Sequence, residues 1–277
     1  MTDILVRRLL VDLQAPIARH WNGGDAFRTA LFNALSFSFP AGEQYFIDAV
    51  KRAQPALDAE QQAAFAADIK GFIGQEATHR RIHQLFNEHL EKQGLVNRWA
   101  ARIERRKLAM DAVGPRNWLA VTAATEHFTA VLAEYLLTRP AALQGAEPRL
   151  RDLWLWHSSE ESEHRSVAFD IYRALGGNEL WRRRIFTAVT INFVVDLSRQ
   201  VLSNLWHDGT WWHWSTWTSA ARTLFGRDGV VTFVLPQWRR YRAANFHPSQ
   251  GDGAPGVQWL RANSALAPTL SSSQVLA

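Results

Sequence analysis

Two Glu-x-x-His pairs constrain the fold of this chain more than any other feature of its sequence. Glu76 and His79 form the first pair, and Glu161 and His164 form the second. Each pair lies near the middle of a segment whose apolar residues recur with the period of a helix. Residues three apart on a helix share a face, so each pair directs a carboxylate and an imidazole to the same point. The pairs therefore indicate two long helices whose inner faces carry metal ligands.

Each pair is preceded by a helical segment with one glutamate among apolar residues. Glu43 and Glu126 are these glutamates, and burying either would be costly unless it is paired or bound to a metal. The order Glu, Glu-x-x-His, Glu, Glu-x-x-His is the ligand order of di-iron and di-manganese carboxylate bundles. The sequence therefore predicts an all-α fold, namely a ferritin-like four-helix bundle with additional C-terminal helices.

The limits of the helices follow from helical periodicity and from the positions of Gly and Pro, since no strand alternation is sustained. We expect a kink or break at Pro40 and an N-cap at Asp58. A basic stretch, 96–112, separates the second bundle helix from the third. The four bundle helices are predicted at about 25–53, 58–93, 115–138 and 149–175. Two later helices are predicted at about 179–206 and 229–244, with a Trp-rich segment between them.

This pattern divides the chain into three parts. Residues 20–177 are predicted to form the di-metal bundle. Residues 178–248 are predicted to form a helical extension that packs on the bundle, on a second copy in a homodimer, or on a membrane surface. Residues 249–277 contain Pro, Gly, Ser and Ala with little apolar periodicity, which predicts a flexible tail.

Further histidines lie near the two pairs. His157 precedes Glu161 by four residues and shares its face, so it either gives a nitrogen to one metal or supports a ligand. His83 follows His79 by four residues and is expected to hydrogen-bond a metal-ligating side chain.

Other polar residues near the ligands receive weaker predictions. His127 is adjacent to Glu126 on its helix and points about 100° away, so we expect it to pack or to support a ligand. Glu134 is expected to line a substrate channel or to pair with an arginine. Glu160 and Glu163 flank the motif glutamate, and solvation or surface pairing is the default expectation for both.

These motifs resemble those of a bacterial family of predicted metal-dependent hydrolases that is thought to be ferritin-like, over residues 20–248. The resembling stretches are Phe39-Pro40-x-Gly42-Glu43, Gln75-Glu76-x-x-His79, Glu126-His127-Phe128, His157-x2-Glu160-Glu161-x-Glu163-His164 and Asn245-Phe246-His247-Pro248. The metal motif is also similar to that of the di-iron arylamine N-oxygenases, in which a histidine at the position of His157 ligates a metal. This similarity implies seven ligands: Glu43, Glu76, His79, Glu126, His157, Glu161 and His164.

Composition limits the chemistry and the location of the chain. The absence of cysteine excludes disulfides, Cys-ligated iron–sulfur clusters and Cys nucleophiles. The net charge of +5 fits a solvated basic face or an anionic membrane surface, and no nucleic-acid partner is expected. We see no signal peptide and no apolar run long enough for a membrane span. The chain is therefore expected to be cytoplasmic, with membrane association as the alternative because of the thirteen Trp residues.

The leading functional hypothesis is a di-iron oxygenase that uses dioxygen and an electron donor to oxidise a small, largely apolar substrate. Phe72, Phe128, Val131 and Leu132 would line its pocket. The alternative is a metal-dependent hydrolase that uses a metal-bound hydroxide. A non-enzymatic iron-binding protein is the third hypothesis. The expected cofactor is two iron ions, with manganese or zinc as alternatives.

Overall fold

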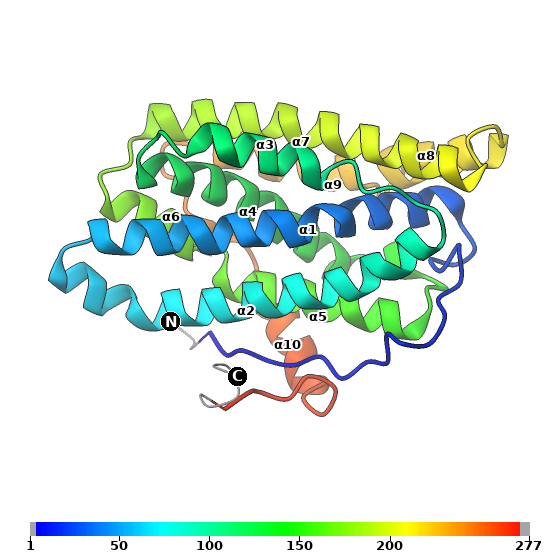
Figure 1. The fold of residues 1–277 in the computed structure, drawn as a ribbon, viewed down its shortest axis with the longest axis horizontal. Helices are drawn as coiled ribbons and strands as arrows, with labels where there is room; N and C mark the ends of the chain where they lie inside the picture. Colours follow the sequence, from blue (N-terminus) through cyan, green and yellow to red (C-terminus); the bar gives the residue numbers. More distant parts are fainter. Residues whose placement is uncertain (1–3, 272–277) are drawn as a thin grey trace.

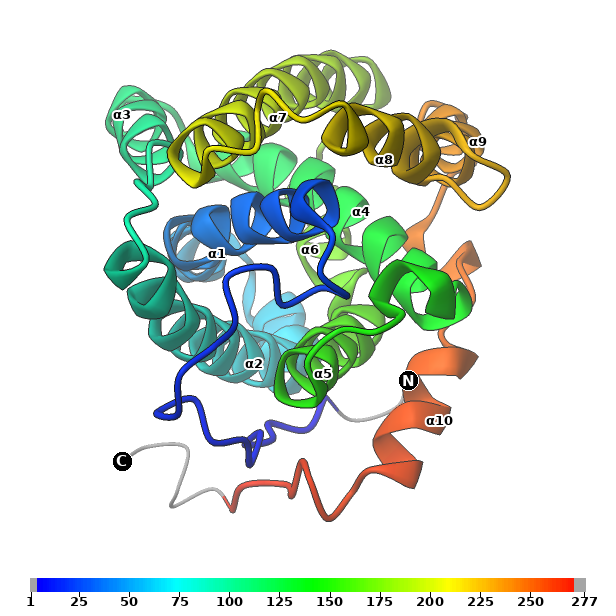
Figure 2. The same ribbon diagram turned by 90° about the vertical axis from the view of Figure 1, so that its right-hand side faces the viewer.

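Four helical columns form the bundle that carries the predicted ligands. The computed structural model describes residues 4–271, and no strand occurs among them beyond two isolated bridges. The columns are α1 (Ala26–Ala53), α2 (Ala59–Lys92), α4 (Pro115–Thr138), and α5 (Pro148–His164) followed by α6 (Val167–Ala174). In Figure 1 these helices run lengthwise through the molecule, and Figure 2 shows them nearly end-on. The predicted all-α bundle is confirmed.

Local sequence signals set the ends of these helices. Asp58 accepts a hydrogen bond from the backbone N–H of Gln61, whose side chain in turn accepts from the backbone N–H of Asp58. This capping box satisfies two N–H groups that the first turn would otherwise leave unpaired. Pro115 and Pro148 occupy the first positions of α4 and α5, where a missing N–H costs nothing.

Of the kink or break predicted at Pro40, the break does not occur, because α1 is continuous through this residue. A proline within a helix leaves the carbonyl four residues earlier without its helical partner. That carbonyl belongs to Ser36, and the side-chain amide of Asn87 on α2 donates to it at 2.9 Å. The tertiary contact replaces the missing backbone bond, so α1 continues to Ala53.

The fourth predicted helix is two helices. Helix α5 ends at His164 and α6 begins at Val167, with a turn at Arg165 and Ser166 between them. Neither turn residue is Gly or Pro, so the sequence does not mark this interruption. The last metal-motif histidine therefore stands at the end of a helix and not in its middle.

A further layer covers one side of the bundle. Helix α7 (Glu179–Asp208) lies across α1 and α4, flanked by α3 (Ala100–Met110) on one side and by α8 (Trp214–Phe225) and α9 (Val230–Tyr241) on the other (Figure 2). Its buried Asp196 forms ion pairs with Arg102, at 2.6 Å, and with Arg106. Its Asn204 donates to the carbonyl of Ala30 at 3.1 Å. Because these polar groups are satisfied by α3 and by α1, they hold this part of α7 against both helices.

The expected flexible tail is wrong for the described residues after 253. Ala254–Ala262 form helix α10, which packs against α5, and Leu260 and Ala267 are buried. The segment after α10 pairs with the N-terminal segment, since the backbone N–H of Leu10 donates to Leu266 and that of Leu270 donates to Val6. The segment has few apolar residues and is stabilised by contacts with a distant part of the chain. Its local sequence pattern therefore did not predict this structure. Residues 272–277 lie outside the described part.

The capping box gives a direct test of the second helix. Asp58→Ala removes the side-chain acceptor for the Gln61 N–H and should lower the free energy of unfolding by about 1 kcal/mol. Urea denaturation followed by circular dichroism measures this change. Glu60→Gln alters a side chain in the same turn and should leave stability nearly unchanged. An equal loss in both variants would contradict the assigned cap.

Candidate metal centre

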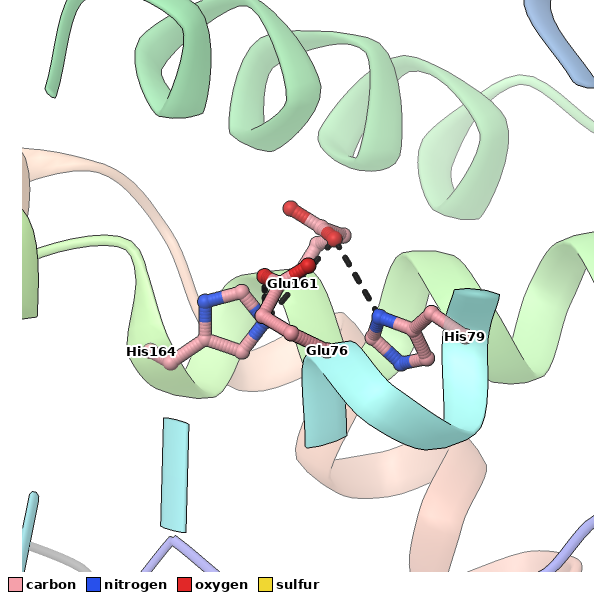
Figure 3. Close-up of side chains that lie close together, drawn as sticks. All are labelled: Glu76, His79, Glu161 and His164. Carbon is pink, nitrogen blue, oxygen red and sulfur yellow. Dashed lines mark ion pairs between the residues drawn. The ribbon is translucent and has the colours of Figure 1, made fainter. Parts of the chain in front are cut away.

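The seven predicted ligands converge in the interior of the bundle. Helix α1 supplies Glu43, α2 supplies Glu76 and His79, α4 supplies Glu126, and α5 supplies the remaining three. None of the seven is more than 4% exposed. Figure 3 shows the four residues of the two Glu-x-x-His pairs directed toward one another. The structure thus brings together every ligand proposed from the sequence.

Glu161 lies at the middle of this cluster. Its Oε1 lies 3.0 Å from Nε2 of His157, 3.5 Å from Nδ1 of His79 and 3.8 Å from Nε2 of His164. One carboxylate oxygen therefore faces three imidazoles from two helices. This arrangement suits a carboxylate that contacts more than one cation.

The other carboxylates surround this centre. His164 lies between Glu126, at 3.0 Å from its Nδ1, and Glu76, at 3.4 Å from its Nε2. The ligand atoms fall into two overlapping groups, each with all atoms within 4.8 Å of one another. The groups are Glu76, His79, Glu161, His164 and Glu43, His79, His157. Two groups that share His79 indicate adjacent positions for cations.

Many of the ligand atoms lack hydrogen-bond partners. Both carboxylate oxygens of Glu43 and of Glu76 are buried and unpaired, and so is one oxygen of Glu126 and one of Glu161. Burial of a polar atom without a partner is costly, and native interiors contain few such atoms. Nδ1 of His79 and Nε2 of His164 are unpaired as well. A cluster of buried, unpaired oxygen and nitrogen donors is what a transition-metal centre requires, so these residues fit such ions.

The protonation of the carboxylates reflects their crowding. Burial and the neighbouring carboxylates raise the pKa of Glu76 well above its usual range. Burial likewise raises the pKa of Glu43, and it raises the pKa of Glu126 to about 7. Burial would also raise the pKa of Glu161, but the neighbouring His164, His157 and His79 outweigh it, so its pKa is well below the usual range. Without a cation the cluster holds protons that a bound metal would displace.

A buried ion-pair network orients His79. Its Nε2 donates to Glu160 at 2.9 Å, which leaves Nδ1 directed at Glu161. Arg7 of the N-terminal segment donates to Glu160 at 3.2 Å and to Glu163 at 2.8 Å. The expectation of solvation or surface pairing is wrong for Glu160, which is fully buried, whereas the half-buried Glu163 pairs with Arg7. A carboxylate behind a ligating imidazole fixes its ring and its tautomer.

A second network orients His157. Nδ1 of His157 lies 2.8 Å from Nε2 of His83, and Nδ1 of His83 lies 2.9 Å from the hydroxyl of Ser36. That hydroxyl donates to the side-chain oxygen of Asn87 at 2.7 Å, while the Asn87 amide donates to the Ser36 carbonyl left free by Pro40. His83 therefore supports a predicted ligand, as expected.

The direction of this network follows from the free carbonyl. A carbonyl only accepts, so Asn87 turns its amide N–H to Ser36 and its oxygen to the hydroxyl. Ser36 then accepts from Nδ1–H of His83, whose Nε2 accepts from Nδ1–H of His157. The remaining lone pair of His157, on Nε2, faces Glu161. Burial lowers the pKa of His157 to about 4, so the ring is neutral at physiological pH and able to bind a metal.

His127 and Glu134 lie outside the centre. The ring of His127 packs against Tyr241 and Phe246, and its Nε2 donates to the carbonyl of Gln237 at 3.1 Å. Glu134 borders a separate cavity of about 30 Å³ that Arg165 also lines. They lie on the same helix as Glu126, but the ligand face is narrow and does not include them. Support of the metal ligands by these two residues is therefore not what the structure shows.

Two apolar cavities reach the cluster. A cavity of about 520 Å³ touches His157 and Glu161, and one of about 390 Å³ touches Glu43. Phe39, Thr129 and Phe193 line both cavities and so separate them. Of the residues predicted to line a pocket, Phe128 and Leu132 border the larger cavity. Phe72 packs on His164 instead, and Val131 borders the small cavity beside Glu134.

Comparison with known protein families places this cluster in context. Residues 5–252 match the family described as predicted metal-dependent hydrolases. The chain belongs to that family. The comparisons with curated proteins and with solved structures gave no match. Membership confirms the family resemblance of the motifs and agrees with metal dependence, while the identity of the metal stays a prediction.

Sequence reasoning missed three residues of this family member that orient its ligands. Arg7 and Asn87 lie in no recognised motif, whereas Glu160 lies within the last ligand motif but was not expected to contact a ligand. All three reach the centre only through tertiary contacts. One signal was available, because a ligating histidine needs a partner for its second nitrogen. That rule predicts a polar neighbour behind His79 but does not say which helix provides it.

The Asn87 network predicts an effect on metal binding. Asn87→Leu removes the group that fixes the direction of the network, so Nε2 of His157 is no longer held as an acceptor. We expect metal affinity to fall about 10–100-fold. Competition of Co²⁺ binding with a chelator measures the affinity, and the Co²⁺ absorption spectrum reports the loss of a nitrogen ligand. Glu88→Gln, an exposed change on the same helix, is the control; an unchanged spectrum in Asn87→Leu would contradict the network.

The metal-free protein should lose stability as pH rises above neutrality. Burial lowers the pKa of His79, but hydrogen bonds to Glu160 and Glu161 outweigh it and raise the pKa from 6.5 to about 10. The folded state thus keeps a proton that the unfolded state releases near 6.5, and the stability it contributes is lost as pH rises toward 10. We expect a decline of about 1 kcal/mol per pH unit between about pH 7 and about pH 9.

Urea denaturation with a chelator present measures this slope. His79→Gln should reduce the slope by the share of this proton, and saturating metal should flatten it because bound cations also replace the protons of Glu43 and Glu76. His207→Gln, an exposed histidine change, should leave the slope as it is. An unreduced slope in folded His79→Gln would show that other groups carry it.

Proposed function

We propose that this chain is a two-metal enzyme that acts on an apolar substrate. The carrying observation is that seven buried oxygen and nitrogen ligands, many without partners, lie where two apolar cavities meet. In this proposal Glu43, His79 and His157 would hold one ion, and Glu126 and His164 would hold the other. Glu76 and Glu161 would complete the donor set. The ligand order along four helices supports a ferritin-like bundle.

The donor set supports dioxygen chemistry at iron as the leading reaction. Four carboxylates and three imidazoles, without a thiolate, suit ferrous and ferric ions. Bound iron would supply the electrons that reduce dioxygen, and an external donor would restore them. The chain itself would bind the substrate in the larger cavity, whose exposed lining is almost entirely apolar, and exclude water from the ligands.

The residues around the ligands have defined tasks in this proposal. Glu160 holds the Nε2 proton of His79, and His83 accepts the Nδ1 proton of His157. Each contact keeps an imidazole lone pair directed at the centre. Phe39 separates the two cavities and contacts the rings of His83 and His157, so it restricts motion of the His157 ring.

Hydrolysis is the second candidate, and the family description favours it. A two-metal site bound to zinc or manganese would activate water for attack on an ester or amide. The apolar cavities would then hold the acyl or alkyl part of such a substrate. Non-enzymatic iron binding has less support, because it gives no role to two substrate-sized cavities that end at the ligands.

Metal loading decides between these reactions. The metal-free protein would be loaded anaerobically with Fe²⁺, or separately with Zn²⁺ or Mn²⁺, and its metal content measured. The leading proposal expects two irons per chain and oxygen consumption by the reduced protein, accelerated by an apolar organic substrate. Cleavage of nitrophenyl esters by the Zn²⁺ or Mn²⁺ form, without oxygen consumption by the iron form, would favour hydrolysis.

A variant pair links the result to the ligands. Glu161→Ala removes the central carboxylate and should reduce bound metal to one ion per chain or fewer, with at least about a 100-fold loss of turnover. Glu104→Ala removes an exposed carboxylate from α3 and should change neither quantity. Full metal content in Glu161→Ala would contradict the two-metal proposal.

A further inference from the structure

The outer face of α7, α8 and α9 concentrates the apolar surface of the molecule. Twelve of the seventeen large hydrophobic side chains that are exposed among residues 4–271 lie between Leu180 and Leu235. Trp214 is 80% exposed, Trp212 75%, Phe225 68% and Trp206 61%. Monomeric soluble proteins rarely expose so many large apolar side chains on one contiguous face. We call this surface the α7–α9 face; it forms the upper side of Figure 1.

Helix α7 lies along the bundle and does not leave it. It is the one helix of the described chain whose length and composition would allow it to cross a membrane, and 22% of its most apolar stretch is buried. Its other side, however, carries Asp196, Gln200 and Asn204, which bond to α3, to the segment before α3 and to α1. Removing α7 from the bundle would expose these groups to lipid unpaired. A helix held along the bundle in this way can lie parallel to a membrane surface but cannot cross the membrane.

The charge of this layer is strongly basic. Residues 180–242 contain nine arginines and three aspartates, a net charge of +6 against +5 for the entire chain. Each aspartate is already paired, since Asp196 contacts Arg102, Asp208 contacts Arg19 and Asp228 contacts Arg139. On the exposed side of α7, Arg184 and Arg199 form no ion pair with any described carboxylate. The face therefore presents Trp, Ile, Val and Leu together with uncompensated positive charge.

The larger cavity opens on this same face. Val194, Phe225, Val231 and Leu235 line the cavity, and each is at least 38% exposed. The opposite end of the cavity touches His157 and Glu161. An apolar passage therefore runs from the exposed surface to the metal ligands.

We propose that the α7–α9 face docks on an anionic phospholipid bilayer, and that the larger cavity receives an alkyl-chain substrate from it. Tryptophan favours the membrane interface, and arginine attracts anionic headgroups. The charge argues against a second copy as the occupant, because the unpaired arginines Arg184 and Arg199 of two such faces would repel each other. Entry of the substrate rests on the proposed function, whereas docking does not.

Vesicle sedimentation of the full chain tests the docking. Binding to vesicles of equal parts phosphatidylcholine and phosphatidylglycerol should be strong at low salt and weaker at high salt. Ile191→Glu/Trp206→Glu should reduce the bound fraction at least about tenfold, because two charges would enter the interface. Leu10→Glu is the matched control, since it places a charge at an exposed leucine of the N-terminal segment, away from this face, and should bind like the unaltered chain.

Other results would overturn the docking. Absence of binding to these vesicles would do so, and so would an equal loss of binding in the Leu10→Glu control. A third such result is an unaltered chain that does not bind vesicles but forms a dimer in solution, which the Ile191→Glu/Trp206→Glu variant dissociates. Circular dichroism shows that each variant is folded. Neither metal nor turnover is needed, so failure of the proposed reaction would leave this result intact.

Entry of an alkyl chain is tested with the fluorescent fatty acid cis-parinaric acid. The metal-free protein should bind it, and Val234→Trp, which fills the cavity, should weaken binding about tenfold or more. The Ile191→Glu/Trp206→Glu variant should still bind the fatty acid, although its binding to vesicles is reduced. Equal affinity in Val234→Trp would overturn the passage, and it would do so whether the centre oxidises or hydrolyses its substrate.

Discussion

The burial of four carboxylates and three imidazoles in one space is the constraint on which the rest of this structure depends. Among residues 4–271 no lysine or arginine forms an ion pair with the four central carboxylates, and Arg7 ends at Glu160 and Glu163. Protons partly compensate the negative charge, as the raised pKa values of Glu43, Glu76 and Glu126 show. Divalent cations would compensate it fully and would satisfy the unpaired oxygens at the same time.

Two hydrogen-bond networks orient the rings of His79 and His157, and their residues come from different parts of the chain. Arg7 belongs to the N-terminal segment, which the strand-like contacts after α10 fix in place. Asn87 acts through Ser36, whose carbonyl is free only because Pro40 interrupts the helical bonding of α1. The same proline that looked like a helix breaker thus sets the direction of the hydrogen bonds that end at His157.

The covering layer meets two opposed requirements. Its inner side must bury polar groups such as Asp196 against the bundle, while its outer side leaves Ile191, Val195 and Trp206 in contact with solvent. A layer serving only to close the core would expose polar residues instead. In the docking that we propose, the cavity that touches Glu161 would connect the exposed apolar side to the candidate metal centre.

The sequence by itself determined most of the bundle helices, their inner faces and the seven candidate ligands that the structure gathers, since periodicity and i, i+3 spacing are local properties. It did not determine the continuation of α1 through Pro40, the pairing of Glu160 with His79, or the order of residues 254–270. Each of these depends on a partner that is remote in sequence: Asn87, Arg7 and the N-terminal segment. Local patterns report which side of a helix is buried, but only the packed structure decides which groups meet there, because that choice is made by contacts between helices.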